Sequence, residues 1–213
     1  MIYNVVDLEK FNKKKDKNSK YNLGIIGICP KRKRLDLAVD IFEGLWQKDN
    51  RYKLYIKGKL PQDYTWLWNK EDERNYFEKV FERIETAPWR DSVIFDGFGN
   101  DIDLWLTKIG YVLSTSDFES FHLSPSEGMA SGAYPIILNW DGSDTIYPKD
   151  FIHKDVSEGI KQVHSLNSKD EAIDSESLKA YIRKHFSIGE ITNKWEHMVL
   201  DLVNVEFNDK AIF

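Results

Sequence analysis

The sequence predicts an α/β fold, a three-layer Rossmann-like parallel sheet with helices on both faces. Short apolar runs, several of them closed by a glycine or a proline, alternate along the chain with segments whose apolar residues recur at helical spacing. This alternation is typical of βαβ units, which build parallel sheets covered by helices. The length of 213 residues suits one large domain of this kind.

Five buried strands are expected in the first two thirds of the chain. Their apolar runs carry few polar residues, as strands covered on both faces do. They span residues 23–28, 52–56, 92–95, 111–113 and 135–138. Because parallel sheets place their ligand sites at the carboxyl ends of the strands, the loops after these five runs are where a site is expected.

Helices are expected between the strands and after the last one. Two segments show a clear apolar stripe, and the second has acidic residues at its front and on its outer face. The stripes consist of Leu35, Leu37, Ala38, Ile41, Phe42 and Leu45, and of Tyr76, Phe77, Val80, Phe81 and Ile84. Further helices are predicted near residues 101–108, from Ser124 onward, and over about 155–165, 175–185 and 188–204.

Residues 1–22 form a linker-like segment, and the ordered domain is predicted to cover residues 23–213. Six lysines lie between residues 8 and 22 with few large apolar residues among them. We favour a solvated linker or surface segment here. The alternative is a patch that binds anionic lipid or phosphate, and with it a peripheral contact with a membrane.

The composition excludes several classes of function. A net charge of −5 argues against a nucleic-acid partner, because nucleic-acid-binding domains are usually basic. Cys29 is the single cysteine, which leaves no disulfide framework and no cysteine-based zinc site and fits a reducing, cytoplasmic setting. No apolar run is long enough for a membrane span, and the N-terminus lacks the features of a signal peptide.

Four consecutive cations follow the first predicted strand, just before a helix. They are Lys31, Arg32, Lys33 and Arg34. A helix N-terminus favours anions, and lysine and arginine add charge-assisted hydrogen bonds to phosphate. A solvated basic turn is the alternative, but the position at the carboxyl end of a strand favours a phosphate site.

The loop after the fourth strand leads into another helix start. Ser124 is a plausible N-cap, Pro125 fits the first helical position, and Glu127 stands where a capping-box glutamate stands. Glu127 therefore has a purely structural interpretation, as does Glu119 as an ordinary loop carboxylate. No second histidine lies near His122 in the sequence, and a lone histidine usually has a structural role or lies on the surface. The free N–H groups of the helix would suit a phosphate.

A longer pattern runs through this region. Glu119 and Glu127 have the E-x7-E spacing, and Gly128-Met129-Ala130-Ser131-Gly132 and a proline at position 135 follow. This stretch resembles the family-4 (group 1) retaining glycosyltransferases of the GT-B fold. Other pieces of the family's pattern occur in the same order, namely Ile2–Phe11, Lys33 with Asp36, Gly97, Gly142-Ser143-Asp144 and the helix around Trp195.

The resemblance implies that the chain is one half of a GT-B enzyme, the nucleotide-sugar-binding half. The segment that resembles Ile2–Phe11 ends the N-terminal domain in full-length members, so the acceptor-binding domain is missing here. The implied activity is transfer of a hexose-type sugar from a UDP- or GDP-sugar, with retention, in glycan or glycoconjugate synthesis. No metal and no other cofactor is implied, and the isolated domain is expected to be inactive.

The resemblance also assigns roles to residues. Lys33 would contact the donor diphosphate and Glu119 the hydroxyls of the transferred sugar, and these two are the candidate catalytic residues. Glu127 would bind the ribose, and Gly97 and the residues up to Ile102 would lie near the base. The other donor contacts would come from Arg32, Arg34 or Lys31, and from the backbone N–H groups of Phe121, His122 and Leu123.

The sequence departs from the family pattern at three points. The usual Gly-Arg after the first strand is Gly27-Ile28, the usual glycine of the loop is His122, and the usual Glu-Ala is Glu127-Gly128. The first departure leaves open a nucleotide-binding module without transferase activity. An unrelated doubly wound domain is a further alternative, and it predicts that Glu119 and Glu127 face different surfaces.

Overall fold

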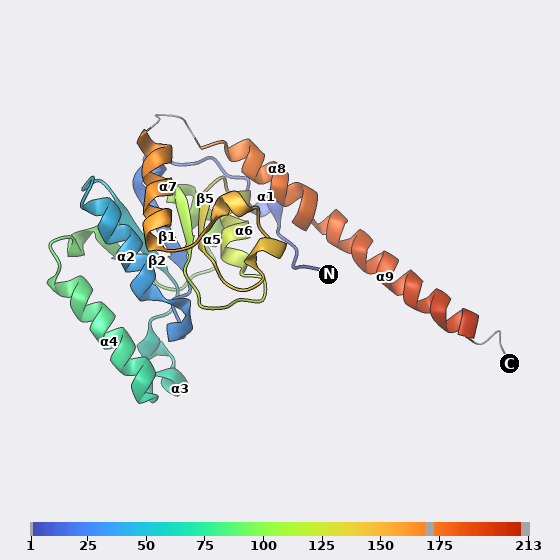
Figure 1. The fold of residues 1–213 in the computed structure, drawn as a ribbon, viewed down its shortest axis with the longest axis horizontal. Helices are drawn as coiled ribbons and strands as arrows, with labels where there is room; N and C mark the ends of the chain where they lie inside the picture. Colours follow the sequence, from blue (N-terminus) through green and yellow to red (C-terminus); the bar gives the residue numbers. More distant parts are fainter. Residues whose placement is uncertain (1, 169–172, 210–213) are drawn as a thin grey trace.

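A computed structural model describes residues 2–168 and 173–209. Its strands form one sheet in the order β3-β2-β1-β4-β5-β6, and every adjacent pair is parallel. Figure 1 shows strands of this sheet among the helices of the domain. The strands are β1 Asn22–Ile26, β2 Lys53–Lys57, β3 Val93–Phe95, β4 Tyr111–Ser114, β5 Tyr134–Leu138 and β6 Ile152–His153. The strand order reverses between β1 and β4, and this switch point is where doubly wound folds bind their ligands.

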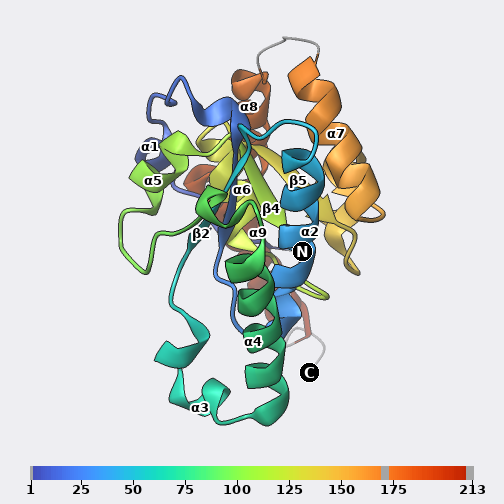
Figure 2. The ribbon, with the colours of Figure 1, turned by 90° about the vertical axis from the view of Figure 1, so that its left-hand side faces the viewer.

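Helices cover both faces of the sheet, which confirms the predicted three-layer fold class (Figure 2). The longer helices are α2 Leu35–Trp46, α4 Glu71–Thr86, α6 Leu123–Ala130, α7 Val156–Ser168, α8 Ser175–Phe186 and α9 Ile188–Asp209. The shorter ones are α1 Leu8–Phe11, α3 Thr65–Trp68 and α5 Ile102–Trp105, with the 3-10 turns η2 Lys31–Lys33, η5 Leu106–Lys108 and η6 Ser143–Thr145 near the features discussed below.

The strands bury alternate residues in two separate cores. In β4, Tyr111 and Leu113 point into the core beneath α2, α4 and α7, whereas Val112 points into the core beneath α1, α5, α6 and α8. In β5, Ile136 and Ile137 divide in the same way. This alternation follows from the two-residue period of a strand, and it explains why the buried runs read as continuously apolar in the sequence.

The boundaries of two predicted elements need correction. The first strand ends at Ile26 rather than Ile28, because Gly27 has a φ of 72° and leaves the extended conformation. The helix predicted to open at Ser124 begins one residue earlier, and its N-cap is His122, with no side-chain cap hydrogen bond. The N-cap prediction for Ser124 and the capping-box prediction for Glu127 are therefore wrong.

The N-terminal segment packs against the domain instead of being solvated along its length. Val6 and Phe11 are 2% exposed and belong to the core beneath α6 and α8. The Lys15 amine is largely buried and donates hydrogen bonds to the carbonyl oxygens of Leu106 (2.7 Å) and Ile109 (2.5 Å) and to Ser131 Oγ (3.2 Å). The prediction of a solvated segment is wrong for Lys15.

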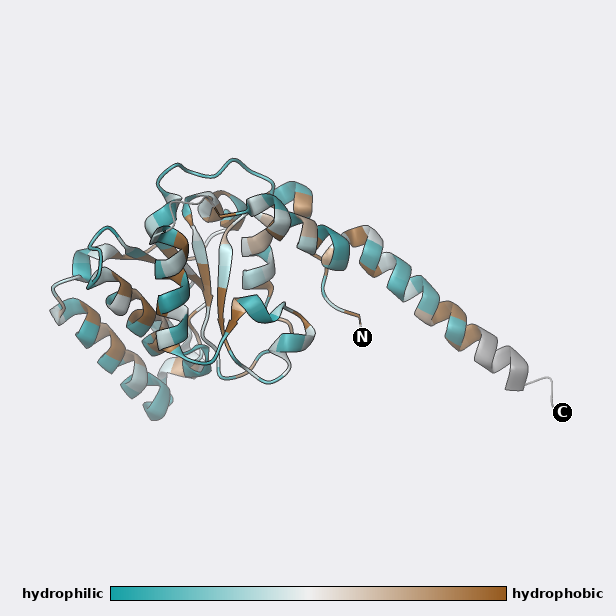
Figure 3. Ribbon diagram, turned by 45° about the horizontal axis from the view of Figure 1, so that its top comes forward, coloured by the Kyte–Doolittle hydropathy of each residue, from teal (hydrophilic) through white to brown (hydrophobic). Residues whose placement is uncertain are grey.

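Helix α9 extends away from the rest of the domain after it has packed against α8 (Figure 3). Ile191, near its start, is buried, and the helix agrees with the one predicted over residues 188–204. Further along, Trp195 and Leu202 are more than half exposed. In the described residues, no helix is both long and apolar enough to cross a membrane.

Candidate functional site

Two loops that are distant in sequence meet at the switch point. The turn η2 follows β1, and residues 115–122 follow β4. The Asp117 backbone N–H donates to the Arg32 carbonyl (2.8 Å), and Thr115 Oγ1 donates to the Lys33 carbonyl (2.9 Å). The basic loop and the E-x7-E loop, which the sequence marked separately, therefore form one surface at the carboxyl ends of β1 and β4.

Four side chains of these loops form the switch-point cluster: Arg32, Lys33, Ser116 and Glu119. Lys33 Nζ forms an ion pair with Glu119 Oε1, Ser116 Oγ donates to the same oxygen (2.7 Å), and Arg32 Nη1 lies 3.4 Å from it. The side chains of Lys33 and Glu119 are only 16% and 8% exposed. The structure thus brings the two candidate catalytic residues into direct contact.

The Glu119 carboxyl is held in its ionised form. Burial by itself would raise its pKa, but the hydrogen bonds from Lys33 and Ser116 and the charge of Lys33 together keep the pKa below its ordinary value. A carboxylate is acceptor-only when ionised, so it can take further hydrogen bonds from hydroxyl groups. This is the chemistry required of a residue that holds the hydroxyls of a sugar.

His122 links this cluster to the end of β4. Its Nδ1 lies 2.7 Å from Ser114 Oγ and its Nε2 lies 4.0 Å from Glu119 Oε1. Burial lowers the pKa of His122 to about 4, and the charges of Lys33 and Arg32 act in the same direction. The imidazole is therefore neutral at pH 7, and it is buried rather than free to act as an acid.

Arg34 and His122 both hold a left-handed backbone, with φ of 52° and 55°, and they are the non-glycine residues with positive φ in the described chain. His122 stands where the resemblance places the usual glycine of the loop. The Arg34 guanidinium donates to Asp36 (3.0 and 2.8 Å) and to Asp117 (2.9 Å). Strained backbone of this kind is concentrated at functional sites.

The N-terminus of α6 presents unused backbone donors beside the cluster. In the described chain, none of the N–H groups of Phe121, His122 and Leu123 donates a hydrogen bond. The Phe121 ring is buried, whereas Leu123 is 40% exposed. Tyr147 Oη donates to the His122 carbonyl (2.9 Å), and this hydrogen bond fixes the backbone at the start of α6. Free N–H groups at a helix start bind anionic groups well.

Glu127 lies on the second turn of α6, and the capping interpretation no longer accounts for it. Within the described residues its side chain makes no hydrogen bond and no ion pair, although its carbonyl accepts from the Ser131 N–H (3.0 Å). Burial raises its pKa to about 7, and the charge of Lys10 opposes this rise only in part. A half-buried carboxyl without a partner is a candidate for ligand binding.

A cavity of about 280 Å³, the base-side cavity, opens at the carboxyl ends of β1 and β2. Lys57, at the end of β2, is nearly buried there and pairs with Asp101 (2.8 Å). The Gly58 N–H donates to the Gly97 carbonyl (3.0 Å), which ties the loop after β3 to the cavity. The lining consists of Ile26, Gly27, Ile28, Cys29, Lys57, Gly58, Lys59, Tyr64, Phe98, Gly99 and Ile102.

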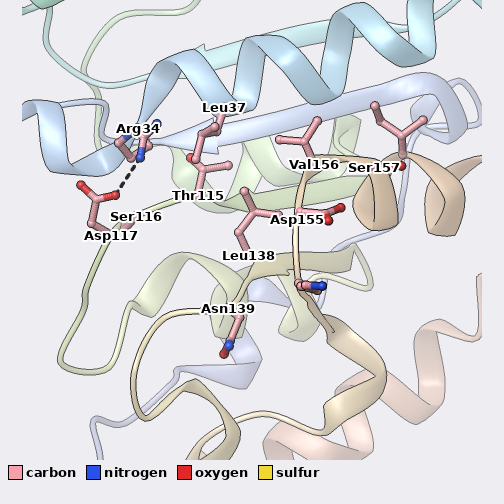
Figure 4. A pocket seen from close by; sticks show the side chains of 12 residues that line it. Arg34, Leu37, Thr115, Ser116, Asp117, Leu138, Asn139, Asp155, Val156 and Ser157 are labelled. Atoms are coloured by element: carbon pink, nitrogen blue, oxygen red, sulfur yellow. Dashed lines mark hydrogen bonds and ion pairs between the residues drawn. The ribbon is translucent and has the colours of Figure 1, made fainter.

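A second cavity, of about 660 Å³, lies on the other side of the cluster, between the first turns of α2 and α7 (Figure 4). We call it the α2–α7 cavity. It reaches the carboxyl ends of β4 and β5, and Arg34 and Asp117 form part of its wall. Its lining consists of Arg34, Leu37, Thr115, Ser116, Asp117, Leu138, Asn139, Lys154, Asp155, Val156, Ser157 and Ile160.

Some site residues were not predicted, and Lys31, a proposed contact of the donor, lies outside the cluster. Lys57 and Asn139 follow predicted strands directly, so the rule that ligands bind at carboxyl ends could have identified them. Lys31 turns toward α4, where its amine pairs with Asp72 and its backbone N–H donates to Glu73 (2.7 Å). Among the residues that the structure describes, no group of three metal-ligating side chains occurs.

The model of the family "Glycosyl transferases group 1" matches residues 7–180. The chain belongs to this family. The match covers both loops of the switch point. It also excludes the alternative of an unrelated doubly wound domain. Among curated proteins, none matches this group 1 chain.

Solved structures share the fold of this group 1 chain. Alr3699/HepE from Anabaena, in complex with UDP, is 15% identical with a TM-score of 0.77, and the match covers 94% of this chain and 57% of that one. A mutant of TarM from S. aureus, in a complex that includes UDP, is 22% identical with a TM-score of 0.72, covering 92% and 38%.

A third match is a domain rather than a whole enzyme. The C-terminal domain of the group 1 protein LpcC from Francisella tularensis is 18% identical with a TM-score of 0.70, and the match covers 86% of this chain and 99% of that one. This chain spans only 38% of TarM and 57% of Alr3699/HepE. It therefore corresponds in fold to one half of a GT-B glycosyltransferase.

Proposed function

We propose that this chain is the donor-binding domain of a retaining glycosyltransferase that uses a UDP-sugar to extend a glycan or glycoconjugate. The observation that carries the proposal is the contact of Lys33 with Glu119 at the switch point, with free N–H groups of α6 beside it. Family membership supports a glycosyltransferase. Two structural relatives were solved with UDP, and one of them also with UDP-glucose, which favours UDP over GDP.

The donor is placed along the carboxyl ends of the strands. The base enters the base-side cavity, near Gly97 and the residues up to Ile102. The ribose hydroxyls bind Glu127, whose carboxyl makes no hydrogen bond or ion pair in the described chain. The diphosphate lies at Lys33 and at the start of α6, and Glu119 accepts hydrogen bonds from the hydroxyls of the transferred sugar.

The task of the protein in this reaction is to stabilise the leaving diphosphate. Negative charge builds on the phosphate oxygens as the bond to the anomeric carbon breaks, while the acceptor oxygen bonds to that carbon and its proton passes to the leaving phosphate. Fixed cations and backbone donors favour this charge. Lys33 supplies one cation, and Arg32, 3.4 Å from Glu119, supplies the one that the missing Gly-Arg would have given. The proposal needs no metal ion.

Transfer also needs an acceptor domain, which this chain does not contain in the proposed assignment. Catalysis requires both reactants to be held together, so the chain alone is expected to bind the donor without turnover. The proposed working location is the cytoplasm, with the acceptor domain of the same enzyme as the main partner. The N-terminal lysines, where they remain exposed, are a proposed contact with an anionic membrane surface.

Isothermal titration of the chain with UDP, GDP and UDP-glucose tests the proposal. UDP is expected to bind, and Lys33→Ala is expected to weaken the affinity for UDP by about tenfold to a hundredfold. This is the effect of losing a charge-assisted hydrogen bond of about 1.5–3 kcal/mol. Lys31→Ala is the matched control, because this lysine pairs with Asp72 on α4 outside the cluster. It is expected to leave UDP affinity within about twofold of the unmodified chain.

Two results would contradict the proposal. One is the absence of binding by every nucleotide at millimolar concentration. The other is equal loss of affinity in the Lys33 and Lys31 variants, because it would mean that general positive charge rather than the switch-point cluster attracts the nucleotide.

A further inference from the structure

The α2–α7 cavity is larger than the base-side cavity, and the proposed donor does not use it. The donor runs from the base-side cavity at β1 and β2 to the cluster between β1 and β4. The α2–α7 cavity begins on the far side of that cluster and continues along the ends of β4 and β5 (Figure 4). It thus lies next to the point of transfer without overlapping the nucleotide.

Ser116 and Arg34 connect the cavity with the cluster. Ser116 lines the cavity and donates its hydroxyl proton to Glu119 Oε1 (2.7 Å), so a ligand in the cavity lies one side chain away from the candidate catalytic carboxylate. Arg34 reaches across from the start of α2 to Asp117, and this ion pair forms one wall (Figure 4).

The charges of the lining cancel. It contains two cations, Arg34 and Lys154, and two carboxylates, Asp117 and Asp155. The Arg34 guanidinium is already paired with Asp36 and Asp117, so it is not available as a full charge for an anion. A cavity of this kind favours a neutral ligand over a phosphate or a carboxylate.

The remaining lining combines hydrogen-bonding groups with a small aliphatic surface. Asn139, directly after β5, and Ser157, on the first turn of α7, are exposed, and the Asn139 Oδ1 accepts a hydrogen bond from Ser143 Oγ (3.2 Å). Leu37, Val156 and Ile160 add aliphatic surface to the lining. Planar amide and carboxylate groups pair with neighbouring hydroxyls, whereas aliphatic side chains pack on the C–H faces of a ring. A sugar ring offers both kinds of surface.

The backbone of Arg34 indicates that this wall is maintained at a cost. Glycine would adopt the left-handed conformation of residue 34 without steric strain, whereas a residue with a side chain is strained there. The side chain that is gained contacts Asp36 and Asp117 and faces the cavity. The strain is therefore balanced by side-chain contacts that shape the cavity wall.

We infer that the α2–α7 cavity is an acceptor subsite that binds a neutral glycosyl unit next to Glu119. This inference rests on the proposed function, because it identifies the ligand opposite the donor. A sugar of the acceptor held here would place the growing glycan on the side of the cluster away from the nucleotide. The acceptor would then be a neutral saccharide where it meets this domain, rather than a polyanion or a lipid.

Amide NMR of the ¹⁵N-labelled chain tests the inference. UDP is titrated first, and methyl α-D-glucopyranoside is then added to the UDP-saturated chain. We expect the glycoside to bind in the millimolar range, as small ligands in open cavities do. The amide signals of Ser116, Asn139 and Ser157 should move, whereas those of Gly58 and Gly99 in the base-side cavity should not.

Two tryptophan substitutions on α7 test whether the glycoside occupies the cavity, and the second is the control for the first. Ser157→Trp fills the cavity from the first turn of α7. It is expected to weaken glycoside binding by about tenfold or more while the affinity for UDP stays unchanged. Ser165→Trp places the same indole at another exposed position of α7, outside the cavity, and is expected to change neither.

Several outcomes would overturn the inference. They are no shift with the glycoside in a chain that binds UDP, shifts confined to the base-side cavity, and binding that survives Ser157→Trp. Preference for glycerol 3-phosphate over the glycoside would also overturn it, since the ligand would then be anionic. If UDP itself does not bind, the proposed function fails and the inference fails with it.

Discussion

Arg34 and His122 show how two side chains can replace the conformational freedom of glycine. Both residues keep a positive φ, and both use their side chains for contacts that glycine could not make. Arg34 pairs with Asp36 and Asp117, and the His122 ring lies 2.7 Å from Ser114 Oγ. These side-chain contacts hold both residues in a conformation that glycine adopts without strain.

A pair of substitutions at Arg34 separates backbone strain from side-chain contacts. Both Arg34→Ala and Arg34→Gly remove the partly exposed ion pairs, but only glycine relieves the left-handed backbone. We expect the glycine variant to be more stable than the alanine variant by about 1 kcal/mol. Urea unfolding of the two variants measures this difference, and equal stabilities would show that residue 34 is not strained in solution.

Glu127 predicts a dependence of stability on pH. Burial raises its pKa from 4.5 to about 7, so the folded chain binds more protons than the unfolded chain between these values. The contribution of Glu127 to stability is therefore complete below about pH 4.5 and is lost as the pH rises to 7. We expect Glu127→Gln to flatten the fall in unfolding free energy between pH 5 and pH 7.

The measurement is urea unfolding at several pH values, with Glu9→Gln as control. Glu9 is exposed on α1, so its replacement is expected to leave the slope unchanged. If the unfolding free energy of the Glu127→Gln variant has the same dependence on pH as that of the unmodified chain, the Glu127 carboxyl is solvated. The proposed role of Glu127 in ribose binding would then lose its support.

Among single residues, the sequence predicted the cluster better than the cavities. Lys33 and Glu119 stand in a motif with fixed spacing, so the resemblance could assign them before their contact was seen. Lys57 and Asn139 stand in no such motif. Their place directly after predicted strands puts them at the carboxyl edge of the sheet, but which cavity each of them lines depends on the strand order and not on local sequence.

At the scale of elements, the start of α6 explains why a local capping rule failed. Ser124 and Pro125 match the statistics of an N-cap and a first helical residue. The helix nevertheless starts at Leu123, because Tyr147 from beyond β5 binds the His122 carbonyl and holds that residue at the cap. A contact between segments 25 residues apart has overridden the local preference.

Tyr147→Phe tests this anchor. The hydroxyl group binds Ser126 Oγ (2.8 Å) and the His122 carbonyl in a buried environment, so its removal leaves buried groups unsatisfied. We expect a loss of about 1–3 kcal/mol in unfolding free energy and weaker UDP binding. Tyr3→Phe, which removes a hydroxyl bonded to Thr145 near the surface, is the control and should cost far less. Comparable effects of the two variants in urea unfolding would argue against the anchor.

The N-terminal segment is joined to the domain by a buried amine. Burial, with the charge of Lys179 adding to it, lowers the pKa of Lys15 to about 7 from 10.5. The unfolded chain therefore binds more protons between these values, and stability should rise with pH from 7 to about 10. We expect Lys15→Met to abolish this rise, and Lys17→Met, at an exposed position, to retain it. A rise that persists in the Lys15 variant, measured by urea unfolding, would refute this assignment.

For the whole molecule, periodicity was sufficient to predict the layers and the five main strands. The order β3-β2-β1-β4-β5-β6 required long-range pairing, and the short elements β6, α1 and α3 carry too few residues for a periodic signal. Lysine content suggested solvation for residues 1–22, but Val6 and Phe11 complete the core beneath α6. Composition could not reveal this burial, because it depends on which part of the folded domain the N-terminal segment packs against.

The site joins parts of both cores, and this predicts how a ligand affects global stability. The β1 loop leads into α2, which covers one core, and the β4 loop leads into α6, which covers the other. A nucleotide that bridges these loops binds only when both cores are folded. UDP at about 100 times its dissociation constant should therefore add about 2.7 kcal/mol to the unfolding free energy. For a domain of this size that corresponds to a rise in Tm of about 5–10 °C.

Differential scanning calorimetry with and without UDP measures this shift. A single transition that moves as a unit is expected, because the two cores share one sheet. Lys33→Ala at the same UDP concentration should show a much smaller shift, since its lower affinity leaves less ligand bound. A shift confined to one of two separate transitions would show instead that the cores unfold independently, and the nucleotide would then contact only one of the loops.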